Sequence, residues 1–168
     1  MIRTTQSVFL LVFAATLAAA LPARAQVQNA NQDALALLVK ATGYQFAQVP
    51  DKDIYLFIFS ASDAKGVDRW FVRVSYNNER KNWVVVSCTV IDKEDSTAFP
   101  LELKDTLLRY NSDVPGSKFA WDEANGDIDV QWEAPTQFLT GGLLARMIID
   151  VASTCDDQYN NLTKLLEP

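Results

Sequence analysis

Four acidic side chains around a single turn come closest, in type and spacing, to a chemical site. They flank the dipeptide Asn125-Gly126 and are Asp122, Glu123, Asp127 and Asp129. The spacing departs from the calcium loop of EF-hands, because aligning Gly126 with the loop glycine places Trp121 at the first ligand position. A carboxylate pair could also serve in glycoside hydrolysis, but nothing in the surrounding sequence indicates a cleft. We therefore expect solvated surface carboxylates here, without a metal ion or a cofactor.

The chain contains no histidine, the commonest general base near neutral pH and the commonest transition-metal ligand. A serine would need another base to become a nucleophile, and Ser62 with Lys65 is the pair that comes nearest to such an arrangement. Both residues lie in a polar stretch that is typical of a loop. The sequence therefore predicts a protein that is not an enzyme.

The only two cysteines, Cys88 and Cys155, each lie on an apolar face of a predicted element. In an exported protein an even number of cysteines favours a disulfide, whereas the alternative is two buried free thiols. A bridge between them would close a loop of 67 residues and stabilise the fold by ~4 kcal/mol in the chain-entropy model. We expect the disulfide.

The N-terminus has the three parts of a secretory signal. Arg3 supplies the positive start, residues 8–21 are apolar, and Ala23-Arg24-Ala25 has the small-x-small form accepted by signal peptidase. The apolar run is shorter than a membrane span and ends at Pro22. We expect cleavage after Ala25, a single domain over 26–168, and a periplasmic or secreted protein.

The charge of the mature chain limits its partners. Without Arg3 and Arg24, 13 basic residues remain against 21 acidic ones, a net charge of −8. A protein of this charge repels phosphate backbones and anionic lipids, so we expect no nucleic-acid binding. No second apolar segment is long enough for stable membrane insertion.

Side-chain alternation predicts three consecutive strands in the first half of the chain. A helix from about Asp33 to Gly43 precedes them, and the strands cover residues 54–59, 70–76 and 83–91. The first strand is apolar on both faces, as expected where both sides are covered. Short polar loops join the three strands, which therefore form an antiparallel meander.

A second helix, a β-hairpin and a long closing helix follow. Pro100 suits the first turn of the second helix, and apolar residues recur from Leu144 to Leu166 in the last one. With Asn125-Gly126 as a two-residue type I′ turn, the hairpin acquires a definite register. Its facing pairs are then Trp121 with Val130, Phe119 with Trp132, and Asp122 with Asp129. Both apolar pairs point inward in this register, towards the same face.

The predicted order is helix, three-stranded antiparallel meander, helix, β-hairpin and long C-terminal helix. This is an α+β domain in which we expect the first and last helices to cover one face of a five-stranded sheet. The second helix ends in Leu107-Leu108-Arg109-Tyr110-Asn111, and the hairpin strands cover residues 118–122 and 126–130. In these segments, and in the element order over 33–166, the chain resembles the YbjN family, whose fold is similar to that of type III secretion chaperones. The resemblance implies a small, acidic, non-enzymatic protein that dimerises and binds a protein segment.

A set of aromatic residues is the candidate partner-binding site. Its members occupy one parity of the first two strands and are Tyr55, Phe57, Phe59 and Phe71. If the residues of the other parity lie under the helices, these four need another cover. That cover is a second layer of this protein or a dimer interface on one interpretation, and a peptide segment of a partner on the other.

The sequence therefore predicts an exported, homodimeric, protein-binding or chaperone-like regulatory module. The alternative is a small-molecule or lipid carrier with an apolar pocket between the sheet and the helices.

Overall fold

The computed structural model describes residues 30–92, 99–113, 115–122 and 126–166, with side chains from residue 34 onward. The predicted signal peptide lies outside these residues. The elements are α1 (Ala30–Ala41), β1 (Ala47–Gln48), β2 (Ile54–Ser60), β3 (Arg69–Tyr76), β4 (Trp83–Ile91), α2 (Leu101–Asp113), β5 (Lys118–Trp121), β6 (Ile128–Pro135), the short 3₁₀ helix Thr136–Phe138, and α3 (Gly141–Lys164). No helix in this part of the chain has the length and apolarity to cross a membrane.

The strands form one antiparallel sheet in the order β1-β2-β3-β4-β6-β5. It contains six strands instead of the five expected, because the extended segment before β2 adds the two-residue β1 to the edge. The three central strands are the predicted meander, and β6 pairs with β4 so that the hairpin extends the same sheet. The α+β element order predicted from the sequence is confirmed.

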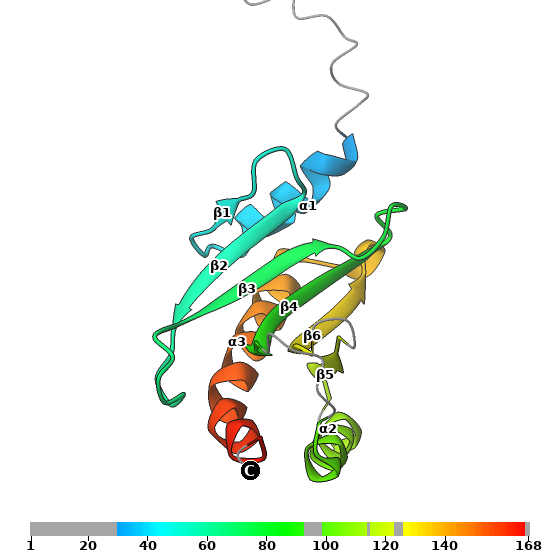
Figure 1. Cartoon of the computed structure of the whole chain (residues 1–168). Coiled ribbons are helices and arrows are strands. Elements are labelled where there is room, and N and C mark those ends of the chain that lie inside the picture. The colour runs from blue at the N-terminus through cyan, green and yellow to red at the C-terminus, as the bar shows by residue number, and fades with distance from the viewer. Residues whose placement is uncertain (1–29, 93–98, 114, 123–125, 167–168) are drawn as a thin grey trace, which may run out of the picture.

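Helices α1 and α3 pack against one face of this sheet (Figure 1). The apolar side of α1 buries Leu35 and Val39, and that of α3 is buried along most of its length, from Leu144 to Leu162. Thr140 caps α3, its hydroxyl accepting a hydrogen bond from the Leu143 amide at 3.1 Å. Helix α2 packs against β5, and its Tyr110 hydroxyl donates a hydrogen bond to the Thr154 hydroxyl of α3 at 3.3 Å. The opposite face of the sheet has no helix over it in Figure 1.

Helices α1 and α3 approach each other closely where one ends and the other begins. A Cβ atom on Gly141 would lie 2.6 Å from the Ala41 Cβ, closer than two carbon atoms can pack. Glycine at position 141 is therefore needed for this contact, whereas the space beside Gly142 is open.

The hairpin register differs from the prediction by two residues. Trp121 pairs with Ile128 and Phe119 with Val130, so Asp129 lies opposite Ala120 instead of Asp122. The Asp122 amide donates to the Asp127 carbonyl at 3.0 Å, which leaves four residues in the connection and not a two-residue Asn-Gly turn. Contacts of the strands themselves, described next, set this register and outweigh the turn preference of the dipeptide.

Phe119 is fixed by helix α2. The side-chain amide of Asn111 donates to the Phe119 carbonyl at 2.9 Å and accepts from the Phe119 amide at 2.7 Å. The Phe119 ring packs edge-on against Tyr110, with ring centroids 4.7 Å apart. A shift of two residues leaves every side chain on its predicted face. Phe119 is accordingly buried and Trp132 half-buried, whereas Trp121 is 37% exposed and rests edge-on against Phe99.

Candidate functional site

The structure separates the four aromatic residues of the predicted partner-binding set. Tyr55 and Phe57 are each 1% exposed and lie under the helices, where the Phe46 ring packs against both. Phe59 is half-buried on the same face, with Tyr44 edge-on to its ring. Phe71 lies on the opposite face. The expectation that the four share one face was therefore wrong for Phe71.

Strand pairing explains this separation. Phe59 pairs with Trp70 and Ile58 with Phe71, so Phe71 belongs with the other parity of β2. Neighbouring residues of a strand point to opposite faces, and the length of the β2–β3 loop decides which parities meet.

Ile58 and Phe71 lie side by side on the helix-free face and are 54% and 55% exposed. Arg69 and Arg73 flank Phe71 on the same face of β3, and Leu56 lies opposite Arg73 on β2. Both arginines are exposed, and Leu56 is partly buried. These five residues are called the open-face patch below. An exposed aliphatic and an exposed aromatic side chain in direct cross-strand contact are the kind of surface that proteins use for binding.

The β4–β6 half of the same face carries Trp83 and Val85 at one end of β4, and several of its polar side chains are hydrogen-bonded within the protein. The Thr89 hydroxyl donates to Asp129 at 2.7 Å across the strand pair, and the Asn77 amide donates to Glu133 at 2.7 Å. Asp129, a member of the predicted acidic cluster, is therefore a hydrogen-bonded carboxylate on the sheet. Glu123, another member, lies outside the described residues. Among the residues described, no group of three or more side chains is placed to hold a metal ion.

The loop between β2 and β3 is held by one carboxylate of α3. Asp156, which is 8% exposed, accepts hydrogen bonds from the backbone amides of Ser62, Asp63 and Ala64 at 3.0–3.2 Å. It also accepts from the Ser62 hydroxyl at 2.6 Å and from the Trp70 indole nitrogen at 3.1 Å. The loop leads directly into β3, so this carboxylate fixes the hairpin that brings Ile58 beside Phe71.

One turn further along α3, the side-chain amide of Asn160 accepts from the Lys65 amide at 2.9 Å and donates to the Asp63 carbonyl at 2.5 Å. In the sequence, Ser62 and Lys65 come nearest to a pair of nucleophile and base. In the structure, Ser62 donates hydrogen bonds to Asp156 and the Lys65 backbone amide donates one to Asn160, so both residues are attached to α3. Burial alone would raise the pKa of Asp156, but the donors from Ser62, Trp70 and Asp63 outweigh it and hold the pKa well below the usual carboxyl range. Asp156 is thus a structural anion at neutral pH.

The two cysteines are buried neighbours across the interface between β4 and α3. Both are free thiols in the structure, and the Cys155 thiol lies 3.8 Å from the Cys88 carbonyl oxygen. Burial, followed by the neighbouring Cys88 thiol, raises the pKa of Cys155 far above its usual value. A thiol in this state is a poor nucleophile. The disulfide therefore stays a prediction, and the fold brings the two cysteines close to each other.

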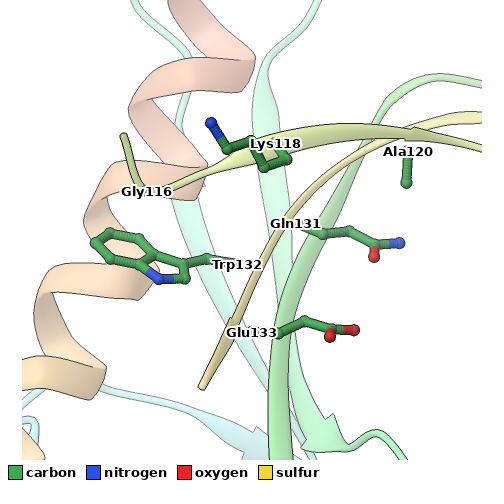
Figure 2. A pocket seen from close by; sticks show the side chains of 6 residues that line it. All are labelled: Gly116, Lys118, Ala120, Gln131, Trp132 and Glu133. Atoms are coloured by element: carbon green, nitrogen blue, oxygen red, sulfur yellow. The ribbon is translucent and has the colours of Figure 1, made fainter. Parts of the chain in front are cut away.

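Three hollows lined by described residues are open to solvent at the surface. Figure 2 shows one of about 420 Å³ at the β5–β6 edge, where the ring of Trp132 points to one side of β6 and the side chains of Gln131 and Glu133 to the other. Lys118, at its rim, donates to the Asn111 carbonyl at 2.7 Å. The residues that would line a pocket under the helices, such as Tyr55 and Phe57, are packed in the core. These hollows therefore do not support the carrier alternative.

Two solved complexes contain chains that this protein matches. A chain of the ExsC–ExsE complex aligns with a TM-score of 0.54 and 14% identity, covering 78% of this protein and 92% of that chain. A chain of the HopA1–SchA chaperone–effector complex aligns with a TM-score of 0.53 and 13% identity, covering 77% and 92%. The fold is similar to that of type III secretion chaperones. The chaperone SycH of Yersinia pestis, in complex with a fragment of YscM2, gives a TM-score of 0.46 at 15% identity over 79% and 98%.

No family model matches the chain, and no curated protein sequence matches it significantly. The chaperone-like fold expected from the sequence is thus confirmed, and the resemblance to the YbjN family stays a prediction.

Sequence reasoning missed Asp156 and Asn160. Asp156 is a buried polar residue whose near neighbours along α3 include the apolar Ala152, Cys155 and Tyr159. A carboxylate among buried neighbours needs strong hydrogen-bond donors, and this was the signal that could have revealed it. The identity of the donors depends on a loop 92–94 residues away in sequence, which periodicity does not show.

Proposed function

We propose that this protein is a chaperone-like module that binds exposed apolar segments of other proteins through the open-face patch and catalyses no reaction. The observation that carries the proposal is the pair Ile58 and Phe71, each more than half exposed and in contact on a face without a helix. Contiguous exposed apolar surface is typical of sites where proteins bind one another. The fold, which is similar to a chain of a chaperone–effector complex, adds support.

The site of action in this proposal is outside the cytoplasm. The signal-like residues 1–25 support export, and the proximity of Cys88 to Cys155 suits an oxidising compartment. A regulatory role of the kind implied by the YbjN resemblance would then consist of sequestering a partner segment and not of chemistry.

A homodimer is part of the same proposal. Leu101 and Leu108 lie on the outer side of α2 and are 75% and 67% exposed. They are seven residues apart, hence on one side of the helix, which is the arrangement of a helix that packs against a partner. We expect wild-type protein to have a dimeric mass in light scattering and the Leu108→Lys variant a monomeric one. Leu37→Lys, at an equally exposed position of α1, is the control and should leave the mass unchanged.

Binding is tested by suppression of aggregation. A model protein that aggregates when its disulfides are reduced exposes apolar segments, and its light scattering reports their capture. We expect wild-type protein to suppress the scattering and the double variant Ile58→Ser, Phe71→Ser to have lost most of this effect. Phe138→Ser is the matched control, because Phe138 is 67% exposed but lies away from the patch.

Three results would contradict the proposal. The first is no suppression by wild-type protein, and the second is equal suppression by the double variant. The third is a change from dimer to monomer caused by Phe71→Ser, since a second copy of the chain would then occupy the open face. Circular dichroism of each variant checks that the fold is intact.

A further inference from the structure

We propose that Arg69 and Arg73 make the open-face patch selective for acidic segments, in which an aliphatic or aromatic side chain has carboxylates on both sides. The inference rests on the proposed function, since it names the chemistry of the partner for the same surface. It differs from that function in assigning a charge preference to the patch.

The arrangement of the two arginines is the first step. Arg69, Phe71 and Arg73 alternate with inward-facing Trp70 and Val72, so the three side chains form a row on the open face. Arg69 and Arg73 are four residues apart on one strand, which separates their Cα atoms by ~13 Å with Phe71 midway. An extended partner segment with an acidic residue two positions before and two positions after an apolar one matches this spacing.

The charges around the arginines are the second step. Neither guanidinium forms an ion pair or a hydrogen bond with any residue that the structure describes, and their cross-strand neighbours Ser60, Leu56 and Ser87 carry no charge. In contrast, Lys81 pairs with Asp53 at 2.6 Å, and Asp129 and Glu133 on the other half of the face have protein donors. Within the described part of the chain, nothing occupies the donors of Arg69 and Arg73, which supports their use by a partner.

The charge of the whole chain is the third step. The protein has 21 acidic against 15 basic residues, so most of its surface repels acidic segments. Two arginines beside the exposed apolar pair make the patch an exception to this repulsion. A guanidinium binds a carboxylate through two parallel hydrogen bonds, and a neighbouring apolar contact that excludes water strengthens such a pair.

A peptide array tests the inference. Synthetic peptides with a central leucine carry glutamate, glutamine or lysine two positions to either side, and their binding to purified wild-type protein is measured. The variants compared are Arg69→Gln, Arg73→Gln on the patch and the control Arg109→Gln, Arg146→Gln on exposed positions of α2 and α3. The control removes the same charge from the helices. Affinities of the best peptides are then measured by fluorescence anisotropy.

We expect wild-type protein and the helix control to prefer the glutamate peptides. The patch variant should bind them roughly fivefold more weakly, since two exposed ion pairs are lost, and bind the glutamine peptides unchanged. The preference should also weaken at salt near ~0.5 M, because the charges are exposed.

Equal binding of glutamate and glutamine peptides, or a lysine preference, would overturn the charge assignment and leave the proposed function standing. Binding of no peptide, or full binding by the Ile58→Ser, Phe71→Ser variant, would overturn the proposed function itself. Vesicles containing phosphatidylglycerol provide the last arm. Sedimentation with these vesicles that depends on Arg69 and Arg73, without any acidic preference on the array, would assign the patch to a lipid surface and refute the inference.

Discussion

Replacement of Asp156 by alanine should strongly destabilise the protein, because five donor groups lose their acceptor. Ser62 and Asp63 are exposed, so water can replace the carboxylate at their amides. Ala64 and the indole of Trp70 are buried, and their donors would be left without a partner. Each buried unsatisfied donor costs about 1–3 kcal/mol, which gives an expected loss of about 3–4 kcal/mol in the free energy of unfolding.

The Asp156→Asn variant removes the negative charge of this side chain but keeps its shape. Asparagine keeps one acceptor oxygen but turns an NH₂ group towards donors, so we expect a loss of about 2 kcal/mol. The wild-type pKa of Asp156 is lowered in the folded state, so the stability from this carboxylate is present above the ordinary carboxyl pKa of about 3.9 and is lost as pH falls below it. The stability difference between wild type and Asp156→Asn should therefore be full at pH 7 and narrow as the pH falls from about 5 towards 3.

Urea unfolding followed by tryptophan fluorescence measures these differences, at pH 7 and at a series of lower values. Asp157→Ala and Asp157→Asn are the matched controls, since Asp157 is the next residue of α3 and is exposed. They should change stability by no more than about 0.5 kcal/mol. Two results would show that Asp156 is not a stabilising anion. The first is a loss of unfolding free energy in Asp156→Ala no larger than that in Asp157→Ala. The second is a stability difference between wild type and Asp156→Asn that widens as the pH falls.

Two other predictions concern the packing of α1 on α3 and the cysteines. Gly141→Ala should lower the thermal midpoint of unfolding, because the added Cβ would overlap Ala41. Gly142→Ala should leave the midpoint unchanged or raise it by an amount equivalent to about 0.5 kcal/mol. Equal effects of the two substitutions would show that the close approach of α1 and α3 is absent. Protein purified from the exported fraction and denatured should contain no alkylatable thiol by mass spectrometry, and reduction should then lower the free energy of unfolding by up to about 4 kcal/mol. Two alkylated cysteines, Cys88 and Cys155, would contradict the disulfide.

The elements of this fold were predictable because each has a periodic pattern, but the face of each strand was not. Alternation identified β2 and β3, and it placed Tyr55 with Phe57 and Trp70 with Val72. Whether Phe71 joins the first pair depends on the loop register, and a change of one residue reverses the answer. The open-face patch therefore could not be assigned from the sequence, although all three of its apolar residues were noted.

The hairpin shows a second limit of prediction from the sequence. Asn125-Gly126 is a strong turn signal, and the predicted faces of Phe119 and Trp132 were correct. The register itself was wrong by two residues, because it depends on the contacts of Phe119 with α2 and of β6 with β4. A turn signal in two adjacent residues carries no information about such contacts, because they join segments that are distant in the sequence.

The paired hydrogen bonds from Asn111 to Phe119 also bear on solubility. Strand β5 is the last strand of the sheet, and an unpaired last strand is a template on which identical molecules stack edge to edge into insoluble material. The amide of Asn111 takes up the outward N–H and C=O groups of Phe119, so a side chain occupies these two edge groups in place of another strand. A protein whose open face attracts apolar segments would otherwise be at risk of precipitating with copies of itself, and Asn111 lessens that risk at the β5 edge while leaving the face free.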